Sequence, residues 1–519
     1  MTPTALFLLV LFPFLGAAFA CLMKAPKVAR TWALLVSFCT FVFSLLVAIA
    51  AGDGRVTWGM DPGNTIEIAQ IGFAVRLACD GVSAWLLLLT TLLMPLVILS
   101  VSPKIDARPD ARWFYTWLLV LLGSIVGCFV AGDALLFYFF FELTLVPCLL
   151  LIGIWGGPDR RRAAGKFFIY TFAGSIFMLI GLLYLGAKAG TFEIGALVAA
   201  AQNPTLVSAN ARFWLALAFL AGFLVKTPVF PLHTWQAPTY AESPNSVTVV
   251  LAAIMSKLGT YGLLRLAIPI GFVGLPPGDL IETVVALCLI SIVYGGLIAW
   301  VQKDMARIMA FSSVSHLGVC VLAILAMNTI GLQGAVVYML AHGLATAALF
   351  FLIGMIADRT GTRDITEMSG LFKSMPIAGT LLVGFTMASI GLPLTSGFVG
   401  EFLSLQGVMN AMGLGIAAVA SLGIILGAIY MLNMVAKIGF GPERAPEGAV
   451  LRDLSGRDLF VLLPIAAAIL LLGVMPTPVL DSFKRDVAML RTPAYSGLPI
   501  HSTVGPAQSE EAVFQEPGQ

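Results

Sequence analysis

Four ionisable side chains interrupt stretches of sequence that are otherwise apolar. Lys226 lies in FWLALAFLAGFLVKTPVFPLHTW and Lys257 in SVTVVLAAIMSKLGTYGLLR, while Glu142 and Glu401 interrupt two other apolar runs. About 20 apolar residues cross the hydrocarbon core of a bilayer, so both lysines are expected near its middle. A charge costs about 2.5 to 3.5 kcal/mol there on insertion scales, and such residues usually face a protein interior or a wet cavity. Buried groups of this kind can carry protons or bind ions.

Two histidines fall in further apolar runs, His316 in AFSSVSHLGVCVLAI and His342 in VVYMLAHGLATAALFFLIG. A single histidine in a membrane helix often only makes a hydrogen bond to a neighbouring helix, and for His342 that alternative stays open. Three serines shortly before His316 could extend a polar path. For the lysines and glutamates the alternative is a set of static ion pairs that orient helices.

Helix-breaking residues accompany two of these groups. Pro228 and Pro231 follow Lys226, and Pro393 with two glycines precedes Glu401. Proline removes a backbone donor and interrupts a helix, which exposes polar backbone to a cavity. The sequence therefore predicts two interrupted spans in different halves of the chain, a pattern that points to an internal repeat with a central ion site.

The composition sets the fold class. The chain has 519 residues, of which 59% are hydrophobic and 11% charged, more apolar surface than a soluble core could hide. We predict an all-α polytopic membrane protein in contact with lipid, with about 14 transmembrane helices. The apolar runs cover residues 4–23, 31–50, 82–101, 113–131, 134–155, 167–187, 211–233, 245–270, 281–300, 306–327, 333–356, 377–408, 412–440 and 458–480.

Lysine and arginine gather in the links that follow odd-numbered spans. The clearest of them are Lys104, Arg108, Arg112, Arg160, Arg161, Arg162, Lys166, Lys303, Arg307, Arg359, Arg363, Lys373, Arg444, Arg452 and Arg457. The positive-inside rule makes these links cytoplasmic and places both termini outside. The basic residues form no continuous face, so no nucleic-acid partner is expected. From about Thr492 the polar end of the chain predicts a flexible tail.

No motif for a cofactor or a metal ion is present. The seven cysteines include no CxxC pair, and no GxGxxG or His/Cys metal spacing occurs. Movement of protons or cations remains as the chemistry that these residue types support.

Five stretches together resemble a known family. They are FFFELTLVPCLLLIGIWG, LVKTPVFPLHTW, VQKDMARIMAFSSVSHLG, AHGLATAALFFLIGMIADR and SIGLPLTSGFVGEFL. As a set they are similar to the antiporter-like subunits of proton-pumping NADH-quinone oxidoreductase, the bacterial counterpart of respiratory complex I. The resemblance runs from about Trp113 to Phe440. Most of the stretches are shared among the L, M and N types of subunit and with Mrp-type antiporters.

The resemblance implies a fold and a set of site residues. The fold has two inverted repeats of about five helices, with the seventh and twelfth helices discontinuous and a polar axis between them. The expected units are residues 1–112 (helices 1–3), 113–270 (first repeat), 281–440 (second repeat), 441–480 (cytoplasmic link and helix 14) and 481–519 (polar tail). The residues that match the axis are Glu142, Lys226, Lys257, His316, His342 and Glu401.

The residue in the twelfth helix separates the types, because Glu401 matches the M subunit whereas the L and N subunits and Mrp relatives carry lysine there. The link Gln236–Pro244 departs from the family pattern by lacking an aspartate and a second histidine. The resulting hypothesis is a pump subunit of the bacterial inner membrane, with no redox centre of its own and with L-type and N-type subunits as partners. The alternatives are a subunit of an Mrp-type sodium/proton antiporter and a structural spacer of the membrane arm.

Overall fold

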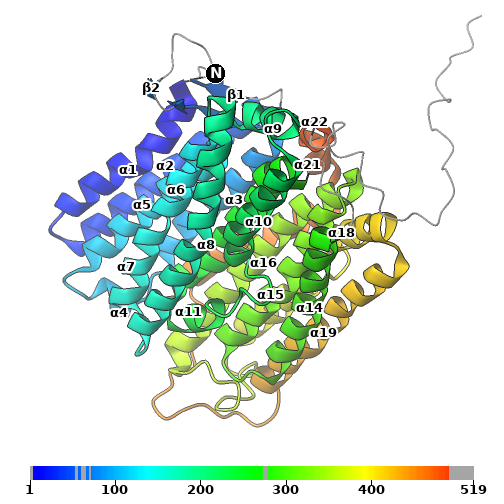
Figure 1. Cartoon of the computed structure of the whole chain (residues 1–519). Helices are drawn as coiled ribbons and strands as arrows, with labels where there is room; N and C mark the ends of the chain where they lie inside the picture. Colours follow the sequence, from blue (N-terminus) through cyan, green and yellow to red (C-terminus); the bar gives the residue numbers. More distant parts are fainter. Residues whose placement is uncertain (1–3, 53–55, 60–65, 69–71, 273–278, 490–519) are drawn as a thin grey trace, which may run out of the picture.

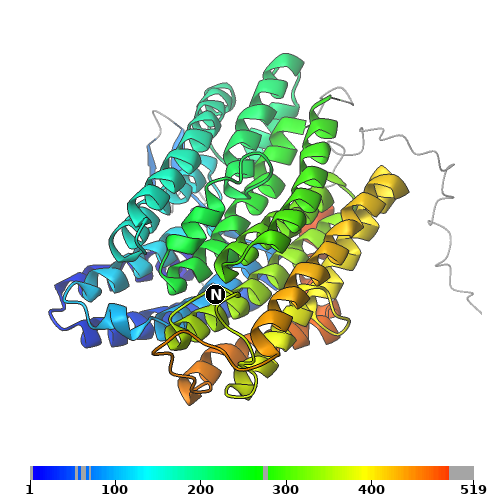
Figure 2. The ribbon, with the colours of Figure 1, turned by 90° about the horizontal axis from the view of Figure 1, so that it is seen from below.

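The protein is a bundle of long helices that run between two faces (Figure 1, Figure 2). The computed structural model describes residues 4–52, 56–59, 66–68, 72–272 and 279–489. Thirteen helical segments in these ranges are long and apolar enough to cross a membrane, which confirms the polytopic helical fold. They are α1 (Thr4–Leu22), α2 (Pro26–Gly52), α3 (Gly81–Leu99), α5 (Ala111–Val130), α6 with α7 (Ala134–Leu143, Leu145–Trp155), α8 (Arg160–Ala189), α10 (Ala209–Lys226), α12 through η3 (Asn245–Phe272), α14 (Asp279–Val301), α15 (Met305–Leu325), α16 (Thr329–Thr360), α19 (Leu414–Gly439) and α20 (Gly456–Val474).

The span predicted over 377–408 consists of two shorter helices, α17 (Pro376–Ser389) and α18 (Ser396–Met412). In the non-helical residues between them, Gly391 and Leu394 have positive φ angles of 79° and 74°. Glycine adopts that conformation without strain and leucine does not, so the chain takes an irregular path between the two helices. The span predicted over 211–233 likewise stops being helical at Lys226. Both predicted interruptions are therefore present.

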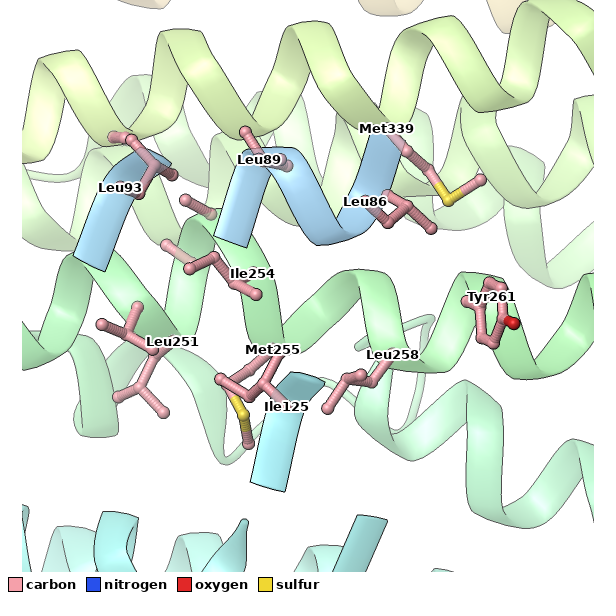
Figure 3. Packing of buried hydrophobic residues seen from close by; sticks show 14 of the residues in the cluster. Leu86, Leu89, Leu93, Ile125, Leu251, Ile254, Met255, Leu258, Tyr261 and Met339 are labelled. Atoms are coloured by element: carbon pink, nitrogen blue, oxygen red, sulfur yellow. The ribbon is translucent and has the colours of Figure 1, made fainter. Parts of the chain in front are cut away.

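Three segments form the centre of the bundle. The segment from α12 to η3, α15 and α16 are buried over nearly their whole length, whereas only 39%, 33%, 33% and 22% of the apolar windows of α1, α2, α19 and α20 are buried. Figure 3 shows Leu86, Leu89 and Leu93 of α3 packed beside Ile254 of the central segment and Met339 of α16. Because the outer helices present apolar side chains, the bundle suits a lipid environment.

Short elements close the two faces. Strands β1 (Val56–Trp58) and β4 (Leu77–Cys79) pair antiparallel, as do β2 (Ile66–Ile68) and β3 (Phe73–Val75). The sequence analysis did not predict these strands, because runs this short carry no readable alternation. The short helices are α4 (Pro103–Asp106), α9 (Ile194–Gln202), α11 (Gln236–Glu242), α21 (Thr477–Ser482) and α22 (Lys484–Met489). The tail predicted from Thr492 lies outside the described residues.

Ion pairs join the links of the face on which the basic residues gather. The guanidinium of Arg359 lies 2.6 Å from the Asp458 carboxylate, and that of Arg363 lies 3.4 Å from Asp304. Arg457 donates to the carbonyl of Leu99 at 2.7 Å. These contacts connect links that are far apart in the sequence and hold the ends of the central helices together.

A close helix crossing gives the first prediction. A Cβ added at Gly400 of α18 would lie 2.6 Å from the Cα of Tyr338 in α16. Gly400→Ala must push the two backbones apart and should destabilise the protein by about 1 to 3 kcal/mol. The control is Gly384→Ala in α17, where nothing lies within 4 Å of the added atom. Thermal unfolding of the purified protein in detergent measures both; equal stability of the two variants would contradict the prediction.

Candidate functional site

Lys226 is the last residue of α10, and the chain after it is non-helical up to α11. Pro228 and Pro231 lack the N–H groups that would continue the helix. The side chain is 2% exposed, and its Nζ donates to Thr144 Oγ1 at 3.2 Å. Nζ also lies 4.6 Å from the ring centre of Phe141. A cation at a helix C-terminus is favoured by the helix dipole, so the break itself helps to hold the ammonium.

Glu142 lies in the last turn of α6, two residues before Thr144. Because Thr144 contacts Lys226, Glu142 lies in the same region as the lysine. Among the described residues, no ion pair with a nitrogen–oxygen distance of 4.0 Å or less joins Glu142 to Lys226. Glu142 Oε1 is buried without a hydrogen-bond partner among the described residues. The structure thus brings the two charges to one region, with Thr144 and not the carboxylate as the direct contact of the lysine.

Lys257 lies in the middle of the central segment and has no exposed surface. It follows a π-helical turn, η2 (Leu251–Met255), and its Nζ reaches the Ala252 carbonyl at 3.1 Å. Nζ also contacts Ser256 Oγ at 3.3 Å and His342 Nδ1 at 2.7 Å. A π turn frees backbone carbonyls and often marks a functional position in a helix. Here the Ala252 carbonyl accepts from both Lys257 Nζ and the Ser256 hydroxyl.

The two histidines continue from Lys257 towards α18. The rings of His342 and His316 have centres 5.7 Å apart. His316 Nδ1 lies 2.7 Å from the Tyr338 hydroxyl, which donates to Glu401 Oε1 at 3.3 Å. We call Lys257, His342, His316, Tyr338 and Glu401 the polar row. All its members are buried, with at most 7% of their surface exposed.

Glu401 ends the polar row beside the break between α17 and α18. A Cβ at Gly391 would lie 2.7 Å from Glu401 Oε2, so the glycine leaves room for the carboxylate. The residue is 5% exposed and lines a cavity of about 540 Å³ between α18 and α19, whose wall is mostly apolar with Gln406 and Ser421 as the other polar side chains. One end of the row therefore reaches an opening at the flank of the bundle.

The two lysines are not joined by a described hydrogen bond. Between them α10 and α13 (Ser256–Gly262) approach closely, because a Cβ at Gly259 would lie 2.2 Å from Thr227 Oγ1. This hydroxyl is buried and has no partner among the described residues. Of the six predicted residues, the structure brings together four in the polar row, and Glu142 with Lys226 in a separate group.

Two polar residues of the site, and a tyrosine that lies beside it, were missed in the sequence. Thr144 contacts Lys226, Tyr338 joins His316 to Glu401, and the Tyr430 hydroxyl lies 3.3 Å from His316 Nε2. Tyr338 precedes His342 by four residues, which puts both on one face of α16. That spacing could have identified Tyr338, whereas nothing in the sequence relates Tyr430 to His316.

Known proteins resemble this chain over most of its length. Residues 131–436 match the family described as NADH:quinone oxidoreductase/Mrp antiporter, TM. NADH-quinone oxidoreductase subunit M of Rhodobacter capsulatus is 38% identical over 480 residues, which cover 90% of this chain and 91% of that protein. Subunit M of Pseudomonas aeruginosa is 36% identical over 496 residues, 91% and 94% of the two chains.

Solved structures have the same fold. A chain of respiratory complex I from Thermus thermophilus with bound NADH superposes with a TM-score of 0.81 at 31% identity, covering 94% of this chain and 99% of that chain. A chain of the Mrp complex from Dietzia sp. has a TM-score of 0.80 at 23% identity, covering 95% and 99%. At that identity the second likeness is one of fold alone.

The contact between Lys257 and His342 gives the second prediction. Lys257→Met or His342→Leu leaves the other buried group without its partner, and each should cost about 1 to 3 kcal/mol of stability. The double variant should lose at least about 1 kcal/mol less than the sum of the two. Thermal unfolding in detergent measures this double-mutant cycle. Lys226→Met combined with His342→Leu is the control and should be additive; an additive Lys257–His342 pair would contradict the prediction.

Proposed function

This chain belongs to the NADH:quinone oxidoreductase/Mrp antiporter family of membrane proteins, and we propose that it is the M-type, proton-translocating membrane subunit of an NADH-quinone oxidoreductase. The observation that carries the proposal is the polar row, in which neighbouring groups that can hold protons cross the buried centre of the bundle to the cavity at Glu401. The relatives named subunit M and the glutamate in place of lysine at Glu401 support the M type.

In this proposal the six predicted residues act in two groups. Electron transfer elsewhere in the enzyme changes the charge near Glu142, and Lys226 then exchanges its proton towards Lys257. From Lys257 the proton moves over the two histidines to Glu401. Moving one charge against 100 mV costs about 2.3 kcal/mol. Rearranging a few hydrogen bonds of about 1 kcal/mol each is enough to gate such a step.

The proposal extends to the surroundings of the chain. The subunit lies in the bacterial inner membrane between L-type and N-type subunits and carries no redox centre of its own. The basic links support a cytoplasmic position for their face. Figure 1 draws the start of α1 and the end of α22 at the opposite face, which supports periplasmic termini. Residues 113–270 and 281–440 form the two inverted repeats, with an interrupted helix in each.

Lys226 and Glu142 give the third prediction, which tests the function. Lys226→Ala should abolish proton pumping and slow NADH oxidation, because the polar row then loses the group that passes protons to Lys257. Glu142→Ala should act in the same direction, since an unpaired buried lysine favours its neutral form. The double variant should lose little more than the worse single variant, because one interaction cannot be broken twice.

The measurement is NADH-driven proton uptake into proteoliposomes with the complex purified in mild detergent and its subunits identified. Recovery with flavin and iron–sulfur subunits is expected. Recovery in an antiporter assembly without them, or normal pumping by Lys226→Ala, would refute the proposed function. Strictly additive losses would show that the two charges are not coupled.

Glu401 gives the fourth prediction. Glu401→Gln keeps the volume and hydrogen bonding of the side chain but cannot ionise, so pumping per NADH should fall while assembly persists. Glu401→Lys should be milder, because related subunits carry lysine there. Glu282→Gln on the exposed face of α14 is the control and should pump normally. Equal proton uptake by wild type and Glu401→Gln would remove Glu401 from the mechanism.

A further inference from the structure

We infer that Tyr338 is a proton relay between His316 and Glu401, so that its hydroxyl handles each proton that reaches the carboxylate. The inference rests on the proposed function and adds a residue that neither the sequence motifs nor the family match assigns. Among the described residues, no hydrogen bond joins His316 directly to Glu401, and the Tyr338 hydroxyl contacts both.

The fold holds this hydroxyl in place from three sides. Tyr338 is 2% exposed and lies on α16, four residues before His342. Its backbone packs against Gly400, the residue before Glu401, which brings the carboxylate within reach. The ring of Tyr338 stacks on that of His316, with centres 6.0 Å apart and planes 28° from parallel. Packing on both neighbours limits the side chain to the rotamer that bridges them.

The chemistry of a phenol suits this position, because it has one proton to donate and lone pairs to accept another. In the starting state the His316 imidazolium donates from Nδ1 to the Tyr338 oxygen, and Tyr338 donates to the Glu401 carboxylate. Transfer breaks the Nδ1–H bond and forms a new phenol O–H bond. The original phenol O–H bond breaks as the proton joins Glu401. The charges change from +1, 0 and −1 to three neutral groups, with no electron gained or lost.

After the transfer, the same two contacts still provide a hydrogen bond for each of the three groups. The new phenol proton points to the neutral Nδ1 of His316, and the Glu401 carboxyl donates to the phenol oxygen. When Glu401 releases its proton into the cavity it lines, rotation of the Tyr338 hydroxyl restores the starting direction. The reset of Tyr338 therefore needs only a rotation of its hydroxyl, and His316 takes its next proton from the Lys257 side of the polar row.

Tyr430 provides a matched comparison on the same histidine. Its hydroxyl lies 3.3 Å from His316 Nε2 and donates to Ser312 Oγ at 2.8 Å. It is as buried as Tyr338, with 1% exposure, but no described hydrogen bond connects it to Glu401. Tyr430 is thus a side branch of the row, and removing its hydroxyl should leave the path to Glu401 intact.

The experiment compares Tyr338→Phe with Tyr430→Phe in the whole purified complex in proteoliposomes. A positioned proton carrier typically contributes about 100-fold or more, so Tyr338→Phe should reduce pumping per NADH to the level of Glu401→Gln. Tyr430→Phe should stay close to wild type. Infrared difference spectra provide a second readout: the Glu401 carboxyl band, identified by its loss in Glu401→Gln, should shift in Tyr338→Phe and not in Tyr430→Phe.

The outcomes separate the relay from the proposed function. If Glu401→Gln pumps less and Tyr338→Phe pumps normally, the relay is overturned and the proposed function stands. If Tyr338→Phe and Tyr430→Phe lose pumping equally, the tyrosines have a packing role and the relay is overturned. Normal pumping by Glu401→Gln overturns the proposed role of the carboxylate.

If Tyr338→Phe does not assemble, 3,5-difluorotyrosine at position 338 keeps the shape of the side chain but acidifies the phenol. The pH profile of pumping should then move to lower pH, and an unchanged profile overturns the relay.

Discussion

A lysine with no exposed surface, in the middle of a bundle whose outer helices face lipid, is the constraint on which the site depends. An ammonium can be buried there only if polar atoms replace its water shell. Lys257 receives the Ala252 carbonyl from the preceding π turn, the Ser256 hydroxyl and the His342 ring. Each of these partners sits on one of the two segments whose apolar windows are completely buried.

Glycine and broken helices make room for these partners. Gly259 lets α13 approach the end of α10 at Thr227, and Gly400 lets α18 approach α16 at Tyr338. Such close backbone contacts are typical between helices in a membrane, where association depends on packing and polar contacts. The two interrupted spans place Lys226 at a helix end and Glu401 beside Gly391. At both breaks the regular hydrogen bonds of the helix are lost, and the charged side chain lies at that place.

The charges of this protein fall into two sets that differ in their partners. The described ion pairs each include a residue from a link or a helix end, and they join opposite full charges such as Arg359 and Asp458. Members of the polar row contact neutral or titratable groups instead. A strong ion pair fixes its protons, whereas a contact between lysine and imidazole allows either group to hold one. The first set stabilises the ends of the bundle, and the second leaves protons free to move.

The sequence by itself determined the membrane fold, the number and approximate limits of the spans and the two interruptions. It also identified Lys226, Lys257, His316, His342 and Glu401 as buried polar groups and Glu142 as a partly buried one. Hydrophobic length and proline positions are local properties, and a charge in an apolar run is visible without knowledge of the fold. Contacts between helices are not local. Only the tertiary structure decided that Lys257 contacts His342 and that Lys226 contacts Thr144 and not Glu142. The same holds for Tyr338, which joins His316 to Glu401. Each of these contacts depends on how the helices are rotated and packed against one another.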